Sequence, residues 1–194
     1  KIVEQGIIRL ALHEVGHTLG LNHNFKASYL HDPVTVHNPE VTQQTGVTAS
    51  VMEYPAVNLA PLGISQGDYY DVIPGAYDKW AIEFGYKPSL SASERENLLF
   101  RSDEPQLMFA NDADDMRRPG KGVDPRAMTN DMSSDPITYA EQRIELVNAT
   151  LEELPEKLVS DSWEEYVNAT QILFRESGRA LETVSRYVGG VYVH

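Results

Sequence analysis

The sequence predicts a mainly helical fold with little β-sheet, on three observations. Residues 2–19 place apolar side chains at the spacing of one helix face, and Gly20 follows where a helix of this length should end. Two longer helices are expected near the carboxyl end, over about 136–154 and 162–188. The segments with the character of a strand are short: residues 106–110, and residues 189–194, where a strand would be beginning.

The first half of the chain is expected to contain one further helix and much irregular structure. Residues 21–50 lack periodicity and are rich in Asn, Pro, Thr, Gln and His, and residues 51–74 continue this character. An irregular stretch of this length in a compact domain is usually functional. A short helix is predicted at 77–86, and Pro88 then marks the end of a first part, residues 1–88.

The second part, residues 89–194, is expected to be a mainly helical region. Ser91 and Glu94 have the spacing of a capping box, which opens a helix. Residues 111–135 are rich in Asp, Gly and Pro and predict a loop. Asp135 is a favoured capping residue for the long helix that follows this loop.

Composition excludes several classes of site and partner. Of the 194 residues, 41% are hydrophobic, which is enough for a buried core. The chain has no cysteine, so disulfides, Cys-ligated zinc and thiol catalysis are excluded. A net charge of -13 argues against a nucleic-acid partner, whose binding depends on basic side chains. No run approaches ~18 consecutive apolar residues, so no membrane-spanning segment is expected.

The segment that carries chemistry is His-Glu-Val-Gly-His-Thr-Leu-Gly-Leu-Asn-His, residues 13–23. On a helix, His13 and His17 differ by ~40° in rotation and ~6 Å in rise, so both imidazoles leave one face and can bind one zinc ion. Glu14 is rotated ~100° from His13, beside the metal position rather than toward it. This placement suits a general base that acts on a water molecule, and does not suit a metal ligand.

His23 can join this site only if the helix breaks. In a continued helix it would lie ~240° and ~9 Å beyond His17, too far to reach the same metal. Gly20 is the residue that lets the chain turn back at low steric cost. Three imidazoles then leave a fourth position open, which is the pattern of a catalytic zinc, whereas structural sites are closed by protein ligands.

This eleven-residue pattern resembles that of the metzincin clan of zinc peptidases. Ser-Val-Met-Glu-Tyr at 50–54 is similar to the Met-turn of that clan. The resemblance implies that Met52 forms a hydrophobic floor under the histidines and that Tyr54 stabilises the developing oxyanion, as in the astacin and serralysin groups. Asn24, directly after the third histidine, does not match astacins, serralysins, matrixins or adamalysins. The closer resemblance is to an uncharacterised bacterial family of large zinc-dependent metalloproteases with a Met-zincin-like domain.

The resemblance implies a zinc endopeptidase that acts on peptide or protein substrates, outside the cell or in the periplasm or cell envelope. His13, His17 and His23 would bind the zinc, and Glu14 would be the general base. Metzincin catalytic domains place a twisted sheet and a helix before the active-site helix, whereas this chain starts at that helix and without a methionine. We therefore expect the C-terminal part of a metzincin-like catalytic domain, which the remainder of a longer protein would complete.

Two other functions fit the same residues. In a non-catalytic module, a fourth ligand such as His31, His37 or a fixed Tyr54 would close a structural zinc site, and the acidic helical region would bind a protein partner. A zinc hydrolase could instead act on a non-peptide substrate, because the motif specifies an activated water and not its target. A calcium site is a further expectation at residues 111–115, by Asp-rich composition alone, since the glycine and distal glutamate of an EF-hand are lacking.

Overall fold

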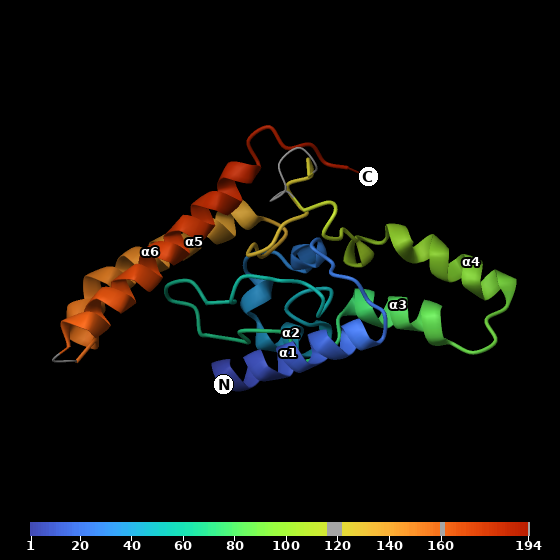
Figure 1. The fold of residues 1–194 in the computed structure, drawn as a ribbon, viewed down its shortest axis with the longest axis horizontal. Helices are drawn as coiled ribbons and strands as arrows, with labels where there is room; N and C mark the ends of the chain where they lie inside the picture. Colours follow the sequence, from blue (N-terminus) through green and yellow to red (C-terminus); the bar gives the residue numbers. More distant parts are fainter. Residues whose placement is uncertain (116–121, 160–161, 194) are drawn as a thin grey trace.

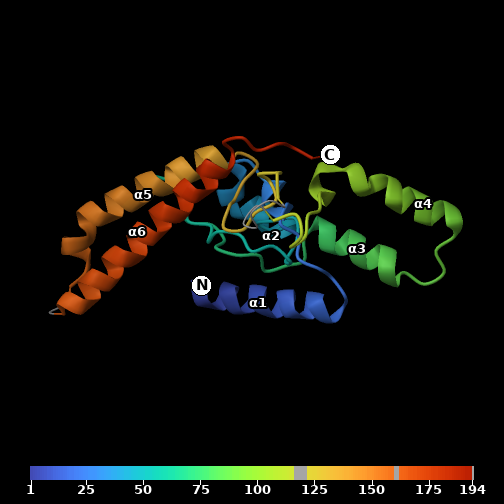
Figure 2. The same cartoon turned by 45° about the horizontal axis from the view of Figure 1, so that its top comes forward.

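The computed structural model describes residues 1–115, 122–159 and 162–193. Over these residues the fold is mainly helical and contains no strand, which confirms the predicted fold class. A central body of loops and short helices lies above one long helix, α1, and a pair of helices extends to each side of the body (Figures 1 and 2).

Helix α1, Ile2–Thr18, ends just before Gly20, as the sequence predicts. Gly20 adopts a φ of 88°, the left-handed conformation that costs a glycine little. The amide of Leu21 donates to the Gly16 carbonyl (3.0 Å), and the chain turns back toward the helix. Many apolar side chains of α1 remain exposed, and the buried residues of this helix are Gln5, His13 and Gly16.

The body is irregular, as expected, but it also contains three short helical segments. These are η1, Ala27–Leu30, η2, Thr35–His37, and α2, Pro39–Thr45. Asn38 caps α2, because its side-chain oxygen accepts a hydrogen bond from the Glu40 amide (2.9 Å). A buried cluster links this body to the second part of the chain, and its members are Val36, Val47, Met132 and Tyr139.

Helices α3, Ala76–Tyr86, and α4, Ala92–Phe100, lie side by side at one end of the molecule (Figures 1 and 2). The indole nitrogen of Trp80 on α3 donates to the Leu98 carbonyl on α4 (2.8 Å). The capping box predicted for α4 is present: the Ser91 amide donates to the Glu94 carboxylate (2.9 Å), and the Glu94 amide donates to the Ser91 hydroxyl (3.2 Å).

The strand predicted at 106–110 is wrong. Two short 3-10 helices lead into this segment, η3, Arg101–Asp103, and η4, Pro105–Leu107, and the rest of it is irregular. The Ala110 amide donates to the Asn24 side chain (3.2 Å), and its carbonyl accepts from the Phe25 amide (2.8 Å). The amide and carbonyl groups of Ala110 are thus bonded to the loop after His23, and they are not available to pair with a neighbouring strand.

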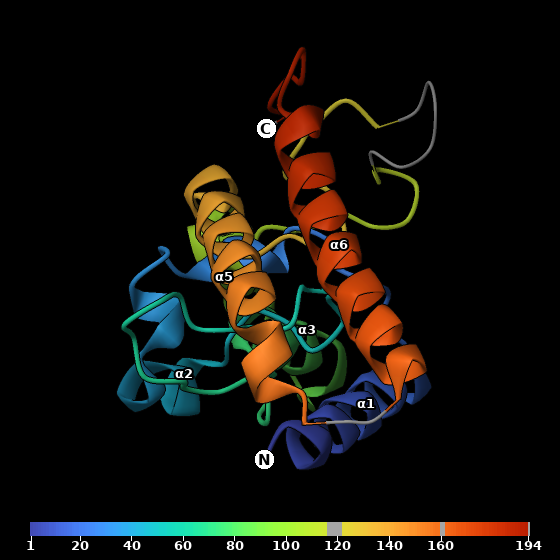
Figure 3. The same ribbon diagram turned by 90° about the vertical axis from the view of Figure 1, so that its left-hand side faces the viewer.

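Helices α5, Pro136–Lys157, and α6, Trp163–Arg186, form an antiparallel hairpin that extends from the body (Figures 1 and 3). Asp135 caps α5 as predicted, since its carboxylate accepts from the Thr138 amide (3.1 Å). The loop expected at 111–135 is irregular where it is described, and its residues 116–121 lie outside the described part of the chain. No helix among the described residues is long and apolar enough to cross a membrane.

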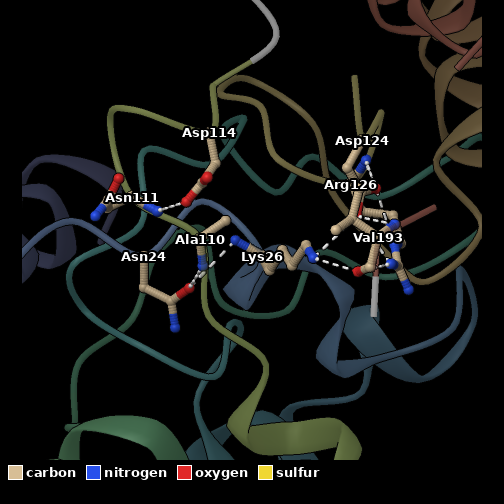
Figure 4. Close-up of polar contacts among 8 residues, drawn as sticks. All are labelled: Asn24, Lys26, Ala110, Asn111, Asp114, Asp124, Arg126 and Val193. Atoms are coloured by element: carbon tan, nitrogen blue, oxygen red, sulfur yellow. Dashed lines mark hydrogen bonds and ion pairs between the residues drawn. The ribbon is translucent and has the colours of Figure 1, made fainter. Parts of the chain in front are cut away.

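Residues 1–88 contact the second part of the chain at Lys26, three positions after His23. Lys26 forms an ion pair with Asp124 (2.9 Å) and donates to the Val193 carbonyl (3.3 Å), as Figure 4 shows. Arg126 binds both carboxylate oxygens of Asp124 (2.8 and 3.0 Å). The segment near the carboxyl end is therefore held against the loop that follows His23, while the division at residue 88 stays a prediction.

Candidate metal centre

Helix α1 and the turn after it bring three histidines together. The ring centroids are 4.7 Å apart for His13 and His17, 4.9 Å for His17 and His23, and 5.3 Å for His13 and His23. Each ring offers one nitrogen to a shared position, and these nitrogens lie within 4.8 Å of one another. The reversal at Gly20 that the spacing required is present, and it places His23 beside the other two rings.

Each ring is fixed through Nδ1, which leaves Nε2 for a ligand. The oxygens bonded to Nδ1 of His13, His17 and His23 are the Val51 carbonyl (2.7 Å), the Leu21 carbonyl (3.1 Å) and Asp112 Oδ2 (2.8 Å), respectively. A carbonyl oxygen only accepts, so in the first two rings Nδ1 donates and the neutral ring presents Nε2 as its acceptor. Metal-binding histidines are commonly oriented in this way by an oxygen on the far nitrogen.

Two observations indicate that these histidines are suited to bind a zinc ion. The Nε2 atoms of His13 and His23 are buried and have no hydrogen-bond partner among the described residues, which costs free energy unless a ligand satisfies them. Burial also lowers the pKa of His13, aided by the positive charge of Arg9 and opposed by the Val51 hydrogen bond. The neutral imidazole that burial favours is the form that binds metal. Three such nitrogens match the protein ligands of a catalytic zinc.

Met52 lies under α1 at the level of the histidines. Its side chain is fully buried, and a Cβ atom at Gly16 would overlap its sulfur. Gly16 stands between His13 and His17, so the missing side chain at this position allows the close approach of Met52. Met52, for which the resemblance implies a hydrophobic floor under the histidines, therefore contacts α1 at Gly16.

Asp78 holds the turn that carries Met52. Its carboxylate accepts from the Ser50 hydroxyl (2.6 Å), the Val51 amide (2.9 Å) and the Gly75 amide (2.8 Å). The carbonyl of Val51 is in turn the partner of His13. The beginning of α3 is thus connected through this turn to the first histidine of the site.

Tyr54 lies beside the histidines, and Glu14 directly follows the first of them on α1. The Tyr54 ring centroid is 5.1 Å from that of His13 and 4.6 Å from that of His23, and 38% of the residue is exposed. Glu14 directly follows His13 on α1 and is exposed. An exposed carboxylate on the same helix and a partly exposed phenol against the imidazole rings are groups that can serve a hydrolytic reaction.

The family model described as Met-zincin matches residues 1–194, the whole length of the chain. The chain belongs to the Met-zincin family. This membership confirms the resemblance on which the sequence interpretation rests, and it supports a zinc metallopeptidase-like domain. No curated protein and no solved structure matches the chain.

Asp112, the oxygen partner of His23 in this Met-zincin, is not predicted by the sequence pattern. Asp112 lies 89 positions beyond His23, and Asn24 brings its loop to the site. Asn24 is fully buried, donates from Nδ2 to the Met108 carbonyl (2.9 Å) and accepts at Oδ1 from the Ala110 amide (3.2 Å), the second contact being drawn in Figure 4. The asparagine that departs from other metzincin groups therefore positions the segment that supplies Asp112.

The calcium site expected at residues 111–115 receives no support. Polar side chains of this loop close its own turn: Asp114 accepts from the Asn111 amide (3.0 Å), and Asn111 accepts from the Ala113 amide (2.8 Å). Among the described residues, the three histidines are the one group of His, Asp and Glu placed to share a metal ion. The acidic composition of this loop instead provides the oxygen that orients His23.

Removing the Asp112 carboxylate should weaken zinc binding without abolishing it. We expect Asp112→Ala to raise the zinc dissociation constant by about 10- to 100-fold, because His23 loses the oxygen that fixes its ring. Competition with a chromogenic zinc chelator measures this constant. Asp103→Ala, which removes an exposed carboxylate from the same region, is the matched control and should bind zinc like the wild type. Equal affinity of the Asp112 variant and the wild type would contradict this role.

His31 and His37 do not belong to the histidine cluster. His31 Nε2 is bonded to the Gly46 carbonyl (3.0 Å), in the body of the fold. His37 is buried and stacks on Tyr139, with ring centroids 5.8 Å apart. The closed structural site in which either residue was a fourth ligand therefore finds no support among the described residues.

His37 should make the fold sensitive to acid. Burial, with the charge of Arg143, lowers the pKa of His37 to about 4, and both of its ring nitrogens lack hydrogen-bond partners among the described residues. The unfolded chain then binds more protons than the fold below pH ~6.5, so stability falls as the pH drops from there toward 4. Between pH 7.5 and 4.5, the free energy of unfolding of His37→Phe should fall by roughly 2 to 3 kcal/mol less than that of the wild type. Urea unfolding of both metal-free proteins measures this, and parallel losses would contradict it.

Proposed function

We propose that this Met-zincin is a zinc-dependent metallopeptidase that hydrolyses peptide bonds. The observation that carries the proposal is the convergence of three imidazoles whose Nδ1 atoms are already bonded to protein oxygens. The described residues add no further His, Asp or Glu to this cluster, which is the arrangement of a site that leaves room for water and substrate. Family membership supports the same class of enzyme.

Each residue of the site has a separate role in this proposal. His13, His17 and His23 would hold the zinc ion through Nε2, and Asp112 would keep the ring of His23 in place. A bound zinc ion supplies a Lewis acid that lowers the pKa of water and polarises a carbonyl group.

The two side chains beside the histidines would move protons and stabilise charge. Glu14 accepts a proton from the water that attacks the scissile carbonyl carbon, and it then donates this proton to the nitrogen of the leaving amine. The Tyr54 hydroxyl donates a hydrogen bond to the oxygen on which negative charge develops. The ring of Tyr54 is held for this task against His13 and His23.

Removal of the metal tests this function on the intact protein. Wild-type protein should contain about one zinc ion per chain and cleave members of an internally quenched peptide library. Dialysis against a zinc chelator should abolish cleavage, and one equivalent of zinc should restore it, because Glu14 depends on a Lewis acid to lower the pKa of the water from which it takes a proton. Undiminished cleavage by metal-free protein, or no cleavage of any peptide by zinc-loaded protein, would contradict the proposal.

A further inference from the structure

Arg9 is a cation next to the histidine cluster that none of the roles above uses. It precedes His13 by four residues on α1, so the two side chains leave the same face of the helix, ~6 Å apart along its axis. Its guanidinium donates from Nη2 to the Glu53 carbonyl, and the guanidinium carbon lies 5.5 Å from the centroid of the Tyr54 ring. Arg9 is thus held over the ring that itself lies against His13.

Arg9 forms no ion pair in the described part of the protein. No carboxylate there forms an ion pair with it, whereas Lys1 and Lys26 pair with acidic residues at 3.4 Å and 2.9 Å. The bond to the Glu53 carbonyl uses one of the guanidinium nitrogens, and arginine has five N–H donors. The guanidinium is therefore oriented in advance and keeps donors for a further partner.

The side-chain carboxyl group of Glu53 does not bind Arg9, although the backbone carbonyl of the same residue does. It is fully buried and accepts hydrogen bonds from the Ser28 amide (3.1 Å) and the Tyr54 amide (2.9 Å). Burial, with the neighbouring Asp131, raises its pKa well above the usual value, which favours the neutral acid. Glu53 consequently contributes its backbone carbonyl to Arg9 and does not cancel the charge.

We propose that Arg9 binds a carboxylate of the peptide substrate and makes the site selective for acidic peptides. This inference rests on the proposed peptidase function. An extended peptide advances ~3.3–3.6 Å per residue. For a peptide bound along α1, the ~6 Å between the levels of His13 and Arg9 therefore corresponds to one or two residues from the scissile bond. The carboxylate belongs either to an Asp or Glu side chain at that distance or to the carboxyl end of the peptide. A planar guanidinium with free donors binds either one by charge-assisted hydrogen bonds.

Paired peptides test the inference on the intact, zinc-loaded protein. Each pair differs in one group within two residues of a mapped cleavage site: Asp against Asn, Glu against Gln, or a terminal carboxylate against a terminal amide. We expect the wild type to favour the acidic member by about 10- to 100-fold in kcat/KM, the range for a hydrogen bond to a charged group. Arg9→Gln should reduce this ratio toward one, and Arg9→Lys should retain part of it as a point charge.

Arg95→Gln is the matched control for these measurements. Arg95 on α4 also lies over an aromatic ring, 5.4 Å from the centroid of Phe84, and its loss changes the net charge equally. This variant should keep the wild-type ratio. The pair that responds to Arg9→Gln identifies the source of the carboxylate, a side chain or the chain end.

Several results would overturn the inference, and they separate it from the proposed function. Equal cleavage of both members of every pair by the wild type would leave a peptidase without this selectivity. A uniform loss of activity in Arg9→Gln with an unchanged ratio would show that Arg9 only supports Tyr54. If zinc-loaded wild type cleaved no peptide at all, the proposed function would fail, and the inference would fail with it.

Discussion

Glu14→Gln should reduce peptide hydrolysis by about 10² to 10⁴-fold while the protein still binds one zinc ion per chain. Glu14 follows His13 on α1 and is exposed, and it does not belong to the cluster whose nitrogens converge. Glutamine keeps the size of the side chain and its hydrogen-bonding carbonyl but cannot accept a proton. The expected loss therefore falls on kcat, with the metal content and the fold unchanged.

The measurement combines metal analysis by mass spectrometry with kcat and KM on one peptide that the wild type cleaves. Glu4→Gln is the matched control, because Glu4 is also an exposed carboxylate on α1 and lies in its first turn, away from the histidines. It should retain wild-type rates. Normal zinc binding together with wild-type cleavage by Glu14→Gln would show that the assigned base is wrong. Loss of zinc from that variant would instead give Glu14 a part in holding the metal.

Local sequence patterns predicted those features that depend on neighbouring residues. The end of α1 at Gly20 and the caps formed by Ser91 and Asp135 are decided within about four positions of each residue, and the structure confirms them. The convergence of the histidines belongs to the same class, because a helical spacing and one glycine determine it. These features could be predicted because contacts with distant segments of the chain have little influence on them.

The features that sequence reasoning missed depend on contacts between distant segments. Asp112 reaches His23 only because buried Asn24 binds the backbone of residues 108 and 110, and no local pattern reports that contact. The same contact displaced the strand expected at 106–110, since its backbone groups are bonded to the loop after His23. The acidic composition of residues 111–115 makes calcium a possible ligand, but composition does not reveal that one of these carboxylates meets His23.

The position of Arg9 beside the site can be predicted from the sequence. It stands four positions before His13, the same spacing that joins His13 to His17, so the sequence places all three on one face of α1. A cation at that spacing is expected to be a neighbour of the site. Its bond to the Glu53 carbonyl, in contrast, requires knowledge of where the Met52 turn lies against the helix.

Gly75→Ala should destabilise the protein by at least about 3 kcal/mol, because the added methyl group has no room. A Cβ atom there would overlap the carbonyl of Ala49 and lie 2.8 Å from the Ser50 amide nitrogen. Both neighbours are backbone atoms, so relief requires α3 to move away from the turn. Asp78 would move with it and would lose its bonds to the Ser50 hydroxyl and the Val51 amide.

This displacement should also reach the metal centre, since the Val51 carbonyl orients His13 and the same turn carries Met52. Urea unfolding measures the stability, and chelator competition measures the accompanying loss of zinc affinity. Gly85→Ala is the matched control. Gly85 lies on the same helix, and a Cβ atom there meets nothing within 4 Å in the described part of the chain. Alanine also favours a helix by up to about 1 kcal/mol over glycine. The control should be as stable as the wild type or slightly more so. If Gly75→Ala unfolded at the same urea concentration as this control, the close contact between Gly75 and the backbone of Ala49 would not be what fixes the turn beneath the histidines.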